Sequence, residues 1–176
     1  MIVCNGALFV HIQKTAGTSI RLAICEGARC VYLAPILDGQ AGMRDPINQF
    51  DPHYHPSRLQ HAFPKGSWTS TCVRNPWQRY VSWYAYKNDS GDFSEFLDRV
   101  LESDHLSPKT QSAYLRGVEY DMVMRMERLD RDWPKLCKRL GINARLGKHN
   151  TSDHGDYRDY YTPETKARVA KSESVL

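Results

Sequence analysis

The chain lacks the cysteine pattern of a disulfide framework or a zinc site. Its five cysteines are an odd number, and none of them forms a C-x-x-C pair. Histidines at positions 53, 55 and 61 could supply metal ligands, but no cysteine pair or H-E-x-x-H pattern accompanies them. We therefore expect reduced, mostly buried thiols and no requirement for a metal.

Long apolar runs are also missing. No stretch is long enough to cross a bilayer as a helix. The N-terminal segment Met1–Leu8 has neither the positive flank nor the extended apolar run of a signal peptide. The sequence thus predicts a soluble, cytoplasmic protein.

There is no internal repeat, no low-complexity segment and no run of basic residues. Of the 176 residues, 41% are hydrophobic and 25% are charged, which is ordinary globular usage and excludes disordered and fibrous classes. The net charge of +4 favours an anionic ligand but falls short of a dedicated nucleic-acid binder. The length fits a single domain covering residues 1–176.

Apolar periodicity predicts strands that alternate with helices. Strands are expected at Ala7–Ile12, Cys30–Leu33, Trp68–Val73 and Asp121–Arg125. Helices are expected after an N-cap at Thr18 or Ser19, from Pro76, and at Pro56–Phe63, Asp92–Glu102, Pro108–Leu115, Asp130–Leu140 and Pro163–Lys171. A long loop is expected at Asp38–His55. Such alternation indicates an α/β fold with a mainly parallel central sheet flanked by helices.

The first strand leads into the turn Gln13-Lys14-Thr15-Ala16-Gly17-Thr18-Ser19. The first N–H groups of the helix that follows have no partner within that helix, and the helix dipole favours an anion beside them. Lys14 adds a charge, Gly17 allows close approach of the backbone, and three hydroxyl residues add donors, namely Thr15, Thr18 and Ser19. The lysine precedes the glycine, so this is not the ATP-binding P-loop. An ordinary strand–helix connection remains the alternative.

The third predicted strand ends at Arg74, and the helix from Pro76 carries Arg79 and Ser82 on one face. Helical side chains lean toward the N-terminus of their helix, which tilts Ser82 toward Arg74. A guanidinium beside a hydroxyl suits a phosphate monoester. A surface arginine with an unrelated serine is the alternative. Two such sites in one chain predict a ligand that is anionic at both ends.

These residues resemble a known family. Residues 9–19 are similar to the phosphosulfate loop of carbohydrate sulfotransferases, the heparan and chondroitin type, which reads F-x-H-x-P-K-T-G-G-T-S. Residues 71–84 are similar to the 3′-phosphate block of that family, V-R-N-P-x-x-R-x-x-S-x-Y. Weaker similarity continues through Arg125–Leu129, Asn150–Ser152 and Tyr160–Glu164. Gln13 and Ala16 depart from the pattern, where the family has proline and glycine.

The resemblance implies a P-loop-like three-layer domain that uses 3′-phosphoadenosine-5′-phosphosulfate (PAPS) as co-substrate. The implied 5′-phosphosulfate ligands are Lys14, Thr15, Gly17, Thr18 and Ser19, and the implied 3′-phosphate ligands are Arg74 and Ser82. The implied acceptor is a hydroxyl group, expected on a sugar or glycan. Relatives continue past the T-P-E segment with another helix and an aromatic tail, so we expect a C-terminus that is short for the family.

Sulfuryl transfer needs a base for the acceptor hydroxyl, and histidine titrates in the right range. His53, His55 and His61 are the candidates; His55 is chosen because His55–Leu59 is similar to an H-x-S-x-x-L stretch in small relatives. Lys14 is expected to neutralise the leaving phosphate oxygen. Two other functions stay open: a nucleotide-dependent kinase of related fold, and a non-catalytic anion-binding homologue.

Overall fold

The structure is a computed structural model that describes residues 2–32, 66–87, 91–102, 110–116, 118–149 and 151–174. The expected loop Asp38–His55 and the expected helix Pro56–Phe63 lie outside these residues. Both remain predictions.

Five strands form one sheet in the order β3-β1-β2-β4-β5. Their bounds are Ile2–Cys4 for β1, Ala7–Val10 for β2, Cys30–Tyr32 for β3, Trp68–Val73 for β4 and Met122–Arg125 for β5. β4 pairs in parallel with both β2 and β5, whereas β1 pairs antiparallel with both β2 and β3. Four strands therefore share one direction, which confirms the α/β fold with a mainly parallel sheet.

Among the described strands, β1 is the one that the apolar pattern does not predict. It joins β2 through a turn at Asn5 and Gly6, whose φ angles of 48° and 73° are both left-handed. Two left-handed residues in a two-residue turn match the twist of a hairpin, and Asn-Gly is the commonest such pair. Because β1 has only three residues, it is too short to show a period.

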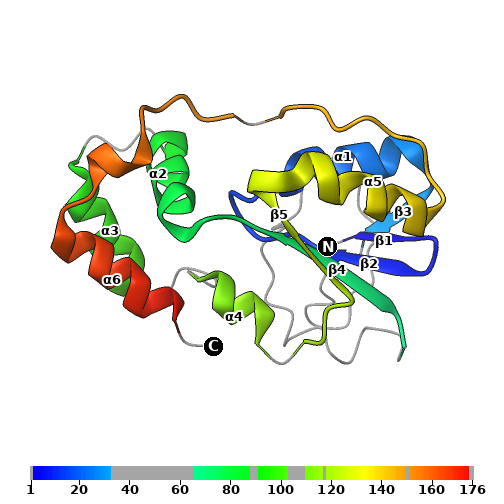
Figure 1. Ribbon diagram of the computed structural model, residues 1–176, viewed down its shortest axis with the longest axis horizontal. Coiled ribbons are helices and arrows are strands. Elements are labelled where there is room, and N and C mark those ends of the chain that lie inside the picture. Colours follow the sequence, from blue (N-terminus) through cyan, green and yellow to red (C-terminus); the bar gives the residue numbers. More distant parts are fainter. Residues whose placement is uncertain are drawn as a thin grey trace, which may run out of the picture.

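Helices cover both faces of the sheet (Figure 1). On one face, α1 (Gly17–Gly27) and α5 (Leu129–Leu140) pack over a core that includes Phe9, Ile24 and Leu136. On the other face, Tyr114 of α4 (Gln111–Leu115) is buried with Leu8, Val10 and Ile12. Because both faces of β2 are covered, its residues are all buried, as in a parallel sheet.

A second group of helices lies beside the sheet (Figure 1) and is made of α2 (Pro76–Lys87), α3 (Phe93–Glu102) and α6 (Pro163–Glu173). Its core is largely aromatic and includes Tyr80, Trp83 and Phe96. The short turns η2 (Met126–Arg128) and η3 (Tyr157–Tyr160) complete the described elements. Across the described ranges, no helix has the length and hydropathy needed to cross a membrane.

The described helices lie close to the predicted positions, with two differences: α4 begins at Gln111 and not at Pro108, and the N-cap of α1 is another residue than predicted. The N-cap of α1 is Ala16, in the left-handed conformation and without a side-chain cap bond, so the prediction of Thr18 or Ser19 is wrong. Gly17 already adopts the helical conformation, which places the helix start before both hydroxyl residues. The loop before α1, and not a side-chain cap, therefore sets where this helix begins.

Candidate functional site

The turn between β2 and α1 has a strained backbone. Lys14 and Ala16 have φ angles of 62° and 63°, a region that disfavours residues with a Cβ atom by about 1–2 kcal/mol. Three contacts hold this conformation. Arg79 Nε donates to the Gln13 carbonyl at 2.9 Å, Arg74 Nη1 donates to the Lys14 carbonyl at 3.5 Å, and Thr15 Oγ1 donates to the Ile12 carbonyl at 2.9 Å. The loop is thus fixed from two other segments of the chain.

Gly17 is required by a close approach to His11. A Cβ atom added at Gly17 would lie 1.8 Å from His11 Cδ2, and His11 is buried at the end of β2. No side chain fits at that distance. The glycine therefore lets the first turn of α1 pack directly on the histidine ring.

Lys14 lies beside a second cation. Burial, followed by the charge of Arg74, lowers the pKa of the Lys14 ammonium to about 8. Its Nζ atom lies 4.1 Å from the ring centroid of Tyr86, a residue near the C-terminal end of α2 that is 58% exposed. The ring faces the ammonium as in a cation–π contact. A lysine that is partly desolvated next to an arginine favours an anionic ligand.

Arg74 follows directly after β4, and its backbone is held on both sides. Its N–H donates to Gln111 Oε1 and its carbonyl accepts from Gln111 Nε2, both at 2.7 Å. Its Nε atom is buried and has no hydrogen-bond partner within the described ranges. Burial lowers the pKa of the guanidinium, while the nearby Glu127 raises it. The group keeps its charge, and the unsatisfied Nε is what an oxyanion would pair with.

Ser82 is buried in α2, and its hydroxyl lies 2.8 Å from the hydroxyl of Ser152. Ser152 belongs to Asn150–Ser152, one of the segments with weaker similarity to the family. This contact therefore joins that segment to α2. Arg79 does not join them as a clamp. Its side chain is fully buried and donates inward, to Gln13 and to Glu173.

The hydroxyl residues of the first loop differ in how free they are. The Thr15 side chain is buried, and its hydroxyl donates to the Ile12 carbonyl. Thr15 can therefore donate to a ligand only through its backbone N–H. Ser19 is also buried, and its Oγ accepts from the backbone N–H of His149 at 3.0 Å. Thr18 is half-buried on the first turn of α1.

The three candidate bases, His53, His55 and His61, lie outside the described residues. Their roles remain predictions. Among the described residues, no group of histidines, cysteines and carboxylates is arranged to hold a metal ion.

Two site residues were missed by the sequence analysis. Gln111 holds the backbone of Arg74, and Glu173 at the end of α6 contacts both Arg79 and the backbone N–H of Gln111. Neither residue stands in a recognisable motif. Each forms hydrogen bonds with residues that are tens of positions away in the sequence. No local pattern could have indicated them.

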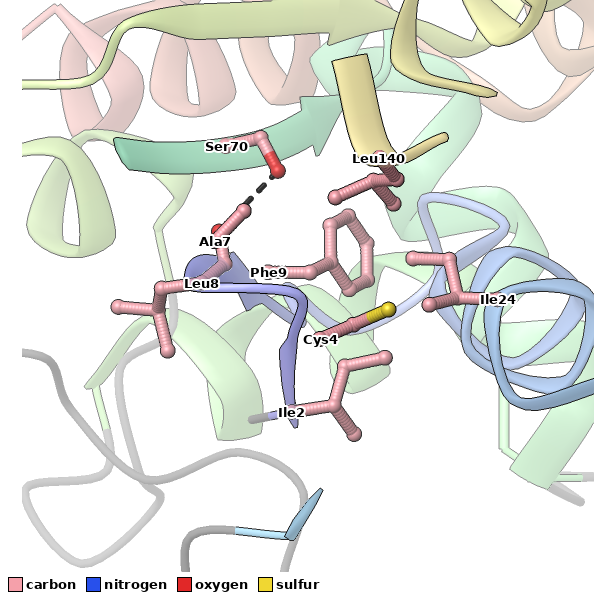
Figure 2. A pocket seen from close by; sticks show the side chains of 8 residues that line it. All are labelled: Ile2, Cys4, Ala7, Leu8, Phe9, Ile24, Ser70 and Leu140. Carbon is pink, nitrogen blue, oxygen red and sulfur yellow. Dashed lines mark hydrogen bonds between the residues drawn. The ribbon is translucent and has the colours of Figure 1, made fainter. Parts of the chain in front are cut away.

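A narrow apolar gap, too small to hold a water molecule, lies in the core between the sheet and the helices that cover it (Figure 2). Its lining is apolar except for Ser70, whose hydroxyl donates to the Leu8 carbonyl at 3.1 Å. Ile2, Phe9, Ile24 and Leu140 line it. Neither Lys14 nor Arg74 lines this gap, so it is not where an anion would bind.

The ends of two neighbouring parallel strands, β2 and β4, thus bring a lysine and an arginine together, each beside the start of a helix. Such crevices at the carboxyl ends of parallel strands are common ligand sites. A search of curated proteins found no match. A family model described as "Sulfotransferase family" matches residues 5–174, which includes both strand ends. The chain belongs to the sulfotransferase family.

Proposed function

We propose that this sulfotransferase uses PAPS as its donor and transfers the sulfuryl group to a hydroxyl group of a carbohydrate. One observation carries the proposal: Lys14 and Arg74 meet where two neighbouring parallel strands end, and Arg74 Nη1 donates to the Lys14 carbonyl at 3.5 Å. Burial and, to a smaller extent, the charge of Arg74 lower the pKa of the Lys14 ammonium. Holding two like charges together is unfavourable unless an anion joins them. A nucleotide with phosphate groups on both sides of its ribose supplies two anionic ends.

In this proposal, the two strand ends divide the donor between them. Lys14 and the backbone N–H groups from Thr15 to Ser19 hold the 5′-phosphosulfate, with the hydroxyl of Thr18 as a further donor. Arg74 and Ser82 hold the 3′-phosphate, and Ser152 supports the hydroxyl of Ser82. Residues 1–176 act as one domain.

The transfer step replaces one S–O bond with another. The acceptor oxygen attacks the sulfur, the bond from sulfur to the phosphate oxygen breaks, and the nucleotide leaves with both phosphate groups. Negative charge gathers on the leaving phosphate oxygen, where the Lys14 ammonium stabilises it. The proton of the acceptor hydroxyl goes to a base, which we assign to His55.

The carbohydrate acceptor rests on the similarity of residues 9–19 and 71–84 to carbohydrate sulfotransferases. An exposed aromatic ring supports it, because Tyr86 stands beside the Lys14 ammonium. Aromatic faces bind the apolar faces of sugar rings.

The test is transfer of sulfur label from PAPS to a panel of oligosaccharides, phenols and amines, with no added divalent metal. We expect labelled sulfate ester on a sugar hydroxyl and loss of transfer in Lys14→Ala. His55→Ala should reduce the rate by about 10²-fold or more while donor affinity is kept. His53→Ala and His61→Ala are the matched controls and should retain most of the rate.

Transfer to phenols or amines alone would refute the carbohydrate assignment. Magnesium-dependent phosphoryl transfer from ATP, without use of PAPS, would refute the proposed donor.

A further inference from the structure

One buried carboxylate lies behind both halves of the proposed donor site. Glu173 is the last residue of α6, and its side chain is 9% exposed. An acidic side chain at the C-terminal end of a helix opposes the helix dipole, so the position is unfavourable without other partners. Burial raises its pKa, and Arg79 and two backbone N–H groups act in the opposite direction.

The first path from this carboxylate leads to the lysine loop. Glu173 Oε1 lies 3.4 Å from Arg79 Nη1, and the Arg79 side chain is fully buried. The same guanidinium donates through Nε to the carbonyl of Gln13, the residue before Lys14, at 2.9 Å. Two links therefore connect Glu173 to the backbone that presents Lys14.

The second path leads to the arginine. Glu173 Oε2 accepts from the backbone N–H of Gln111 at 2.9 Å and of Ser112 at 3.5 Å. The Gln111 side chain then clamps the N–H and the carbonyl of Arg74, both at 2.7 Å. Figure 1 shows the end of α6 beside the start of α4, which is where these bonds form.

From this geometry we infer that Glu173 is a positioning residue that sets the spacing between Lys14 and Arg74. The inference rests on the proposed function, because spacing matters only for a ligand bound at both ends. When both ends bind together, the second contact is effectively intramolecular, and its benefit depends on the match between the two sites. A ligand with one anionic end contacts only one of the two sites, so its affinity does not depend on the distance between them.

The experiment compares two ligands by calorimetric titration. 3′-Phosphoadenosine-5′-phosphate has both ends, whereas adenosine 5′-phosphate has only one. In Glu173→Gln, an amide NH₂ replaces one carboxylate oxygen and cannot accept from Arg79 or Gln111. We expect the dissociation constant of the two-ended ligand to rise at least about tenfold and that of the one-ended ligand to change less than about threefold.

Glu102→Gln is the matched control. Glu102 ends α3 as Glu173 ends α6, but its side chain is 75% exposed and it contacts Arg168 at 3.7 Å. This variant makes the same charge change and should leave both dissociation constants unchanged. All titrations are run well below the thermal transition of each variant, so that the protein is folded. If Glu173 only stabilised the fold, Glu173→Gln would lower the transition temperature but would leave the ratio of the two affinities unchanged.

If Glu173→Gln does not fold, Gln111→Met tests the same inference. It removes the two side-chain hydrogen bonds to the Arg74 backbone and keeps the side-chain size. It should change the ratio in the same direction. An unchanged ratio in the folded variants, with normal binding by the wild type, would overturn the role of Glu173 alone. Failure of the wild type to bind 3′-phosphoadenosine-5′-phosphate would instead overturn the proposed function.

Discussion

At the scale of single residues, Lys14 is a group of the candidate site whose charge varies with pH just above neutrality. Its pKa is lowered to about 8 by burial and by Arg74. A lysine is charged below its pKa, so the ammonium is lost as the pH rises through about 8. We expect the affinity for 3′-phosphoadenosine-5′-phosphate to fall between about pH 7 and about pH 9, where an ordinary lysine with a pKa near 10.4 would stay charged.

The measurement is the dissociation constant across this range for the wild type and for Lys14→Arg. Arginine keeps its charge throughout, so the variant should show a much flatter profile. A wild-type affinity that is constant between these pH values would contradict the account of Lys14.

The proximity of Lys14 and Arg74 in the candidate site was predictable, and the hydrogen-bond network behind them was not. Lys14 and Arg74 each follow a recognisable apolar strand, and the structure brings them together as the pattern indicates. Arg79 lies in helix α2 on the predicted face with Ser82, but its side chain is buried and bonds to the Gln13 carbonyl and the Glu173 carboxylate. Spacing along a helix tells which face a residue occupies, but not whether another segment covers that face.

At the scale of elements, the contact between β2 and α1 depends on Gly17. A methyl group there would overlap the buried His11 ring, so Gly17→Ala must shift either the ring or the first turn of α1. We expect a loss of about 1–3 kcal/mol in the free energy of unfolding together with weaker donor binding. Urea denaturation and calorimetry measure the two effects.

Gly155→Ala is the control, because a Cβ atom at Gly155 would meet nothing within 4 Å. Its unfolding free energy should stay within about 0.5 kcal/mol of the wild type. Equal stability of the two variants would show that the packing of His11 on α1 is looser than the structure indicates.

Elements with a readable apolar pattern were predicted, including the short strands β3 and β5, whereas β1 was not. β4 and α2 carry clear periodic patterns, and both form where they were expected. The three-residue β1 has no readable period, although its Asn5-Gly6 turn is a hairpin signal that the apolar pattern ignores. The cap of α1 was misplaced because the left-handed Ala16, and not a hydroxyl side chain, ends the loop.

At the scale of the whole molecule, the site joins segments from distant parts of the chain. Gln111 and Glu173 bond to residues 37 to 94 positions away. Such contacts depend on how α4 and α6 pack, which hydrophobic patterning does not specify. The fold class follows from alternating strands and helices, whereas the support of the site follows from tertiary packing.

The central claim is that Lys14 and Arg74 bind the two ends of one nucleotide. Calorimetric titration with 3′-phosphoadenosine-5′-phosphate, without divalent metal, tests it most directly. Lys14→Ala and Arg74→Ala should each weaken binding at least about tenfold, because each removes a charge-assisted contact. Arg158→Ala, which removes a 70% exposed arginine side chain that pairs with Asp156, should bind like the wild type. Binding that is equal in all four proteins, or absent from the wild type, would contradict the account.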